Sequence, residues 1–169
     1  MNIPVFVSCP TDLSKMQNKG REVILDQLKE LQIAPRALGR GDYPSELPLR
    51  EVYTIAKHCS GGVILGFNQF ETDKGMWKKG TDKEQPLKEP IAFPTPWNHL
   101  EAGILFGLRL PLLIFREPKI RGGVFDVGVT DVFVHPIPTP PLDEENKTAL
   151  KQVFLKWSSK VRDLYYSID

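Results

Sequence analysis

Short apolar runs alternate with longer stretches of helical periodicity along the chain. Five short runs are predicted to be strands, at residues 3–8, 34–38, 63–67, 111–115 and 131–137. Such alternation predicts an α/β fold, in which a parallel sheet is covered by helices on both faces.

Helices are predicted at residues 19–33, 50–60, about 97–108 and about 143–166. The residues expected to face inward are Ile24, Leu28 and Leu31 in the first helix, Val52, Ala56 and Cys59 in the second, and Leu150, Phe154, Trp157, Val161 and Leu164 in the last. The last helix should therefore pack on the sheet.

Ligands in parallel α/β sheets bind outside the carboxyl ends of the strands. The loops that follow strands are residues 8–13, 39–48, 67–97 and 116–123. Residues 68–96 form a long insertion rich in Lys, Gly and Pro, and a loop of that length is uncommon in a compact domain unless it is a lid or a binding loop. The aromatic residues Phe67, Phe70, Trp77 and Phe93 bracket this insertion, where they either stack on a ligand or bury the insertion against the core.

The composition limits the class of protein. A chain of 169 residues, 41% of them hydrophobic, suits one domain spanning residues 1–169, and a net charge of +1 gives no reason to expect a nucleic-acid partner. No apolar run reaches the ~18 residues that cross a bilayer, and no signal-peptide pattern opens the chain. We therefore expect a cytoplasmic protein with no membrane partner.

The potential metal-ligating residues are dispersed. Cys9 and Cys59 do not have the spacing of a metal site, and both are expected to be small buried side chains. The three histidines are equally scattered, so no metal site is predicted.

One acid, Glu101, interrupts an otherwise apolar stretch, "TPWNHLEAGILFGLRLPLLIF" at residues 95–115. If Asn98 caps the helix, Glu101 completes a capping-box-like pair and has a structural role. If Thr95 is the cap, Pro96 falls at the first helical position, where proline is favoured, and Glu101 lies in the second turn, beyond use as a cap. We prefer the second arrangement because it uses more of the local sequence.

In that register, neighbours of Glu101 on the helix have predictable roles. Trp97 lies one turn before the acid and would limit its hydration, which raises the pKa of a carboxyl, and Asn98 could orient it. Gly103 and Gly107 each cost the helix about 1 kcal/mol relative to alanine, so they either let a ligand approach the backbone or, as we prefer, pack tightly against the sheet. Arg116 and Arg121 flank the loop after the fourth strand, where they either reach a phosphate or form an ordinary basic turn.

Several stretches in order resemble the TIR domains and the related nucleoside 2-deoxyribosyltransferase-like proteins. They are "VFVS" in the first strand, "ALGRGDYPSE" after the second, "CSGGVILGF" at the third, and "PWNHLEAGILFGLRLPLLIF". The Trp97-x-x-x-Glu101 spacing is similar to that of NAD-cleaving TIR domains, whereas Glu101-Ala102-Gly103 and "GLRLPLLI" are closer to the transferases. The resemblance spans residues 3 to about 137.

The resemblance implies a flavodoxin-like three-layer sandwich with a five-stranded parallel sheet and a C-terminal helix. It also implies cleavage of an N-glycosidic bond, with Glu101 as the catalytic residue. The residues that would line the substrate site are Ser8, Cys9, Pro10, Arg40, Asp42, Phe67, Trp97 and Asn98. NAD⁺ would be a substrate, and no cofactor would be needed. No general acid would be required either, since the nicotinamide ring leaves as a neutral molecule.

Three classes of function follow. The first is an NAD⁺ glycohydrolase or producer of an ADP-ribose signal, which the resemblance places in bacterial anti-phage defence, as a homo-oligomer or in assembly with a separate sensor or effector. The second is a nucleoside 2-deoxyribosyltransferase acting on a nucleoside or nucleotide. The third is a non-catalytic nucleotide-binding or assembly module. The insertion at residues 68–96 is longer than is usual in TIR domains, so the pocket wall there departs from the family pattern.

Overall fold

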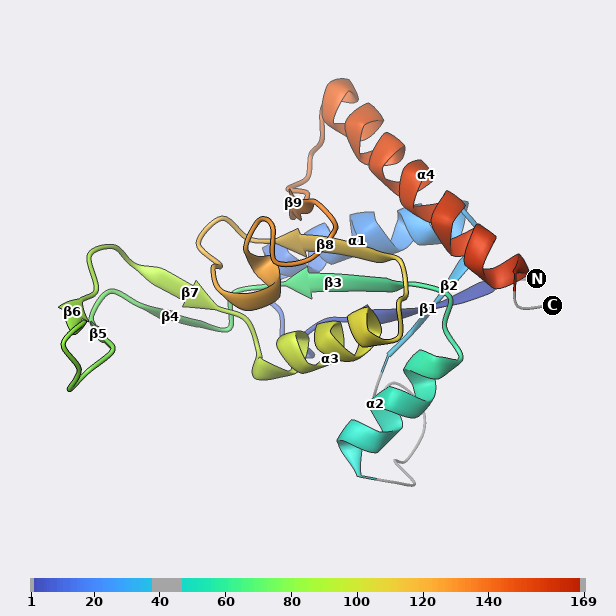
Figure 1. Ribbon diagram of the computed structural model, residues 1–169. Helices are drawn as coiled ribbons and strands as arrows, with labels where there is room; N and C mark the ends of the chain where they lie inside the picture. The colour runs from blue at the N-terminus through green and yellow to red at the C-terminus, as the bar shows by residue number, and fades with distance from the viewer. Residues whose placement is uncertain (1, 38–46, 168–169) are drawn as a thin grey trace.

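Five parallel strands form the centre of the protein in the computed structural model, which describes residues 2–37 and 47–167 (Figure 1). The strands are β1 (Ile3–Ser8), β2 (Ile33–Arg36), β3 (Gly62–Gly66), β8 (Leu112–Arg116) and β9 (Val134–Pro136). Their order in the sheet is β2-β1-β3-β8-β9, and every neighbouring pair is parallel. This is the order of the flavodoxin-like α/β fold, which the sequence predicted.

Helices cover both faces of the sheet, so the molecule has three layers (Figure 1). Helices α1 (Lys15–Glu30) and α4 (Glu144–Tyr166) lie on one face, and α2 (Pro48–Lys57) and α3 (Pro96–Gly107) lie on the other, where α3 also contacts the short 3-10 helix η1 (Gly123–Phe125). None of the helices in the described part of the chain combines the length and the apolar character that crossing a membrane requires.

The α1/α4 face follows the hydrophobic pattern of the sequence. Ile24 and Leu28 of α1 and Phe154, Trp157 and Val161 of α4 are buried in a single cluster with residues of the sheet, as predicted. The Trp157 ring also donates a hydrogen bond from Nε1 to the Pro111 carbonyl oxygen at 3.0 Å. This bond satisfies the polar atom of a large ring that is otherwise in apolar surroundings.

The insertion is a β-arm and not an open loop. Strands β4 (Phe70–Thr72) and β7 (Ile91–Phe93) pair antiparallel, and β5 (Met76–Trp77) and β6 (Gln85–Pro86) pair at the tip. The arm (residues 68–94) extends from the carboxyl edge of the sheet (Figure 1). Phe70 and Phe93 face each other across β4 and β7 with ring centroids 6.5 Å apart, so these two aromatic residues stabilise the arm itself.

Two other predictions are wrong. The fifth strand is only Val134–Pro136, and Phe133, assigned to it from the sequence, is 81% exposed in the preceding loop. Gly103 and Gly107 do not pack tightly against the sheet, because a Cβ atom at either position would meet nothing within 4 Å. Both glycines lie on the outer side of α3, a side on which the apolar residues Leu100 and Phe106 are about half exposed.

Candidate active site

The start of helix α3 matches the arrangement that we preferred from the sequence. Thr95 is the N-cap, its hydroxyl accepts a hydrogen bond from the Asn98 amide at 3.3 Å, and Pro96 occupies the first helical position. Glu101 consequently lies in the second turn, where the free amides of the helix start are out of its reach. The acid is therefore not a helix cap.

The start of α3 lies where the chain changes direction in the sheet. From β1 the chain passes to β2 on one side, and from β3 it passes to β8 on the other. In open α/β sheets such a switch point leaves a crevice at the carboxyl ends of the two central strands. Ser8 is the last residue of β1, and Leu65 is next to last in β3.

Asn98 joins both strands to α3. Its Nδ2 donates to Ser8 Oγ at 2.8 Å and, at 3.4 Å, to the Leu65 carbonyl oxygen, while its Oδ1 accepts from the Thr95 hydroxyl at 3.0 Å. The Asn98 side chain is 1% exposed and is held from three directions. The Ser8 hydroxyl also interacts with the Glu101 carboxyl and lowers its pKa.

Glu101 is the only acidic residue among the buried polar and charged residues of the described chain, with 8% exposure. Burial raises the pKa of its carboxyl above the ordinary value, and the hydrogen bond from Ser8 opposes that rise. The prediction that Asn98 orients Glu101 needs a correction in detail, since Asn98 acts through Ser8. These four side chains, Thr95, Asn98, Ser8 and Glu101, are called the switch-point network below.

The other residues predicted to line the site differ in how open they are. Pro10 is buried, and Cys9 is half-buried with its thiol donating to the Pro10 carbonyl oxygen at 3.4 Å. Trp97 is 40% exposed, so its indole is open to a ligand or a partner. Phe67 is fully buried in the core cluster of the α1/α4 face, so its ring belongs to the core and is not open for stacking on a base.

Two of the residues predicted to line the site, Arg40 and Asp42, lie outside the described residues. These two residues remain predictions from the resemblance.

A second acid at the carboxyl edge, Glu117, was missed by the sequence interpretation. It directly follows β8, and its Oε2 accepts from the Asn68 amide at 2.6 Å and from Gln17 Nε2 at 2.9 Å. Glu117 thereby connects the start of α1 with the base of the β-arm. The sequence does place Glu117 directly after a strand, where functional residues are common. A residue that only holds two segments together can occupy the same position, and the hydrogen bonds of Glu117 show that it has this structural role.

Two other candidate groups have structural partners. Arg116 donates from Nη1 to the carbonyl oxygens of Ile120 and Phe125 at 3.0 and 2.8 Å, so it shapes the turn after β8. His99 packs edge-on against the Phe125 ring at 5.4 Å, and a Cβ atom at Gly123 would lie 2.7 Å from His99 Nδ1. Gly123, with φ of +58°, is therefore explained by its contact with His99.

No group of three or more His, Cys, Asp or Glu residues within residues 2–37 and 47–167 is arranged to hold a metal ion. Burial raises the pKa of the Cys59 thiol to about 11, partly offset by the charge of Arg36, so this thiol stays protonated at neutral pH. Cys59 is a small core residue, as predicted.

No model of a known protein family matches the chain, and no curated protein shows significant sequence similarity to it. The resemblance to TIR domains and deoxyribosyltransferases consequently rests on the stretches quoted above.

Proposed function

We propose that the protein cleaves the N-glycosidic bond between nicotinamide and ribose in NAD⁺, with Glu101 as the catalytic residue. The observation that carries this proposal is the placement of Glu101, a buried acid that does not cap its helix and lies at the switch point of the sheet. A desolvated carboxyl costs stability, and such groups cluster at functional sites. The Trp97-x-x-x-Glu101 resemblance names NAD⁺ as the substrate.

The chemistry needs little more than one carboxylate. The nicotinamide ring of NAD⁺ is already a cation and leaves as a neutral molecule, while positive charge grows on the ribose, as it does in glycoside hydrolysis. An ionised Glu101, close to Ser8 in a poorly hydrated site, stabilises that charge until water bonds to the ribose carbon and releases a proton, which gives ADP-ribose. The cationic ring also favours the ionised form of Glu101 when the substrate binds, which offsets the effect of burial on its pKa.

The composition of the switch-point network favours NAD⁺ over a deoxynucleoside. An ordinary nucleobase is a poor leaving group unless it is protonated, so a transferase benefits from a general acid. The partners that link to Glu101 among the described residues are Ser8, Asn98 and Thr95, none of which is an acid. This set suits a substrate whose leaving group needs no proton.

The test is mass spectrometry of NAD⁺ incubated with the wild type, with Glu101→Gln and with the control Glu22→Gln, an exposed acid on α1. We expect nicotinamide release by the wild type and the control, and a loss of about 10³-fold or more in Glu101→Gln, since electrostatic terms of this kind are worth several kcal/mol. The ADP-ribose product is identified in the same spectra as free, cyclic or conjugated.

A parallel incubation with deoxyuridine and free adenine tests the transferase alternative. Base exchange that depends on Glu101, without consumption of NAD⁺, would replace the proposed substrate with a deoxynucleoside. Ligand-induced thermal stabilisation without any turnover in either assay, at protein concentrations up to those that drive assembly, would leave only a nucleotide-binding module.

Assembly with further copies is part of the proposal, and the outer side of α3 supports it. Trp97, Leu100 and Phe106 are 40%, 48% and 50% exposed on a helix whose one acidic residue is buried. Exposed apolar groups of this kind favour protein contacts. Activity per subunit should therefore rise with protein concentration, and Leu100→Glu should weaken that rise.

A further inference from the structure

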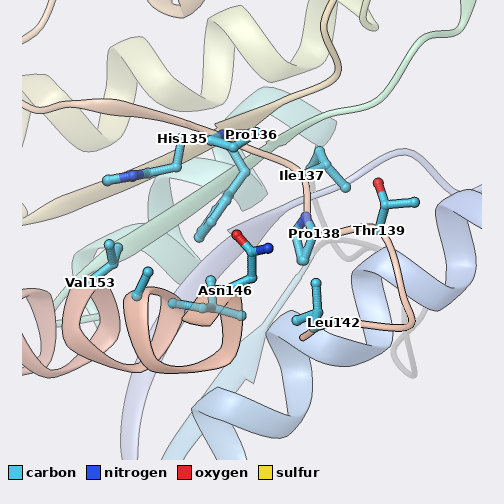
Figure 2. A pocket seen from close by; sticks show the side chains of 11 residues that line it. His135, Pro136, Ile137, Pro138, Thr139, Leu142, Asn146 and Val153 are labelled. Atoms are coloured by element: carbon cyan, nitrogen blue, oxygen red, sulfur yellow. The ribbon is translucent and has the colours of Figure 1, made fainter. Parts of the chain in front are cut away.

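The α1/α4 face contains a hollow that has no part in the switch-point network. It is a half-open cavity of about 290 Å³ between the end of β9 and the first half of α4 (Figure 2). Phe115 of β8, fully buried, lines it from the sheet. Glu101 lies on the opposite face of the sheet, where α3 packs.

The wall of this cavity is largely apolar and carries no carboxylate, ammonium or guanidinium group. Its eleven lining residues are Phe115, His135, Pro136, Ile137, Pro138, Thr139, Leu142, Asn146, Ala149, Leu150 and Val153. Burial lowers the pKa of His135, so its imidazole is neutral at pH 7. A charged ligand would lose its hydration here without gaining a countercharge, so the cavity favours an uncharged one.

Rings already pack together at the base of the cavity. The His135 ring lies 5.7 Å from the Phe115 ring, tilted by 44°, and Phe115 in turn stacks on Phe154 at 5.9 Å. A flat aromatic ligand extends such a series through offset-stacked or edge-to-face contacts. Pro138 and Leu142 lie away from His135, toward the other end of the cavity, and are part of its apolar wall (Figure 2).

Three of the lining side chains are polar, those of His135, Thr139 and Asn146, and Asn146 lies at the exposed side of the cavity. The amide of Asn146 extends from α4 toward the segment after β9 (Figure 2). Its Nδ2 is bound to Asp143 Oδ2 at 3.0 Å, which fixes the orientation of the amide. Among the hydrogen bonds of the described residues, Oδ1 of Asn146 has no donor, so it is available to accept one from a ligand.

We propose that this cavity binds an uncharged, flat aromatic molecule of about two fused rings that carries one hydrogen-bond donor for Asn146. The size follows from the volume, because an apolar cavity of roughly 150 Å³ holds benzene, and this one is about twice as large. The ligand class follows from the neutral wall, the ring contacts and the acceptor oxygen of Asn146. The site does not depend on the proposed NAD⁺ cleavage.

The probe for this proposal is indole, with two matched molecules. Calorimetry and methyl NMR shifts of Ile137, Leu142 and Val153 should show saturable binding of indole, with Kd below about 1 mM. Indole-3-carboxylate, with the same rings and a negative charge, should bind at least tenfold more weakly. 1-Methylindole, which lacks the donor, should bind several-fold more weakly than indole.

Two variants locate the site. Ala149→Trp fills the cavity from α4 and should reduce indole affinity at least tenfold, whereas Lys151→Trp, an exposed position that does not line the cavity, should leave it unchanged. Asn146→Ala should lower the affinity for indole to that for 1-methylindole, and it should leave the affinity for 1-methylindole unchanged. This second comparison decides the question if Ala149→Trp does not fold.

The proposal is overturned if indole shows no saturable binding, or if Ala149→Trp binds it as the wild type does. It is equally overturned if indole-3-carboxylate binds as tightly as indole, since a neutral wall cannot produce that result. None of these outcomes affects the proposed function, whose assay measures NAD⁺ consumption at Glu101.

Discussion

Helices α3 and α4 cover opposite faces of the same sheet and differ in where their charged side chains lie. In α4, Phe154, Trp157 and Val161 face the core, and lysines such as Lys151 and Lys156 are exposed. In α3, the one acid is buried, and Trp97, Leu100 and Phe106 are 40–50% exposed. A helix whose role is packing follows the rule of apolar inside and charged outside. The comparison teaches that α3 breaks the rule at the residue proposed to act on the substrate.

The largest loss of stability is expected when the Trp157 ring, which packs α4 against the sheet, is removed. Trp157→Ala leaves a large cavity and an unpaired Pro111 carbonyl oxygen, so we expect a loss of about 3–5 kcal/mol in the free energy of unfolding. Trp97→Ala on α3 should cost less than about 1 kcal/mol, because that ring is already 40% exposed. Urea unfolding of both variants makes the comparison, and equal losses would contradict the assignment of Trp97 to the surface.

A smaller loss is expected at the buried amide of α3. Asn98→Ala leaves the Leu65 carbonyl oxygen and the Ser8 and Thr95 hydroxyls with fewer partners, which should cost roughly 1–3 kcal/mol in unfolding free energy. The control is Asn146→Ala on α4, where the amide is exposed and the change should stay within about 0.5 kcal/mol. A neutral Asn98→Ala would show that the network does not hold α3 to the strands.

The buried acid itself should reduce stability at neutral pH. Because burial raises the pKa of Glu101 in the folded state, that state binds more protons than the unfolded chain between the two pKa values, and stability falls as the pH rises through this window. Glu101→Gln removes the charge, so it should be more stable than the wild type at pH 8 by roughly 0.5–2 kcal/mol. Exposed Glu22→Gln should show no such gain.

Measuring the unfolding free energy of the wild type and of Glu101→Gln over a range of pH tests the direction of this effect. The advantage of Glu101→Gln should shrink as the pH is lowered toward about 4, where Glu101 becomes protonated in both states. An advantage that grows on acidification would mean that the folded protein favours the ionised carboxylate, contrary to its burial.

The smallest effect concerns the glycines of α3. Gly103→Ala adds a Cβ atom in open space within a helix and should stabilise the protein by up to about 1 kcal/mol. Gly61→Ala is the counterpart beneath α4, where the new Cβ atom would lie 2.7 Å from Val161 Cγ2, and it should destabilise. Thermal unfolding distinguishes the two, and a loss in Gly103→Ala in the isolated protein would indicate a contact that the structure does not contain.

Much of the fold was predictable because strands and amphipathic helices have distinct periods. The hydrophobic repeat of α4 correctly predicted which side of the helix faces the core and, closely, where the helix begins and ends. The start of α3 at Thr95 and Pro96 was predicted from the local capping chemistry. The β-arm was not predicted, since two- and three-residue strands are too short to show a period. Phe133 was misassigned for a related reason, because an apolar loop and an edge strand look alike in sequence.

The candidate site was predictable only in part. Glu101 was identified because a lone acid in an apolar helix is conspicuous, whereas Ser8 was included because of the resemblance. Asn98 is connected to Glu101 through Ser8. The hydrogen bond between Asn98 and Ser8 joins residues 90 positions apart in the sequence, and no local pattern predicts such a contact. Phe67 was misjudged because an aromatic residue at a strand end has the same sequence signature whether it faces the core or a ligand.

The most direct test of the central claim is an NMR titration of the Glu101 side-chain carboxyl carbon, assigned by its absence in Glu101→Gln. The account predicts a midpoint above the ordinary glutamate pKa of about 4.3, and a further rise in Ser8→Ala, since the hydroxyl of Ser8 lowers the pKa that burial raises. A midpoint at or below the ordinary value, unchanged in Ser8→Ala, would mean that Glu101 is solvated and apart from Ser8, which would contradict the site on which the proposed function rests.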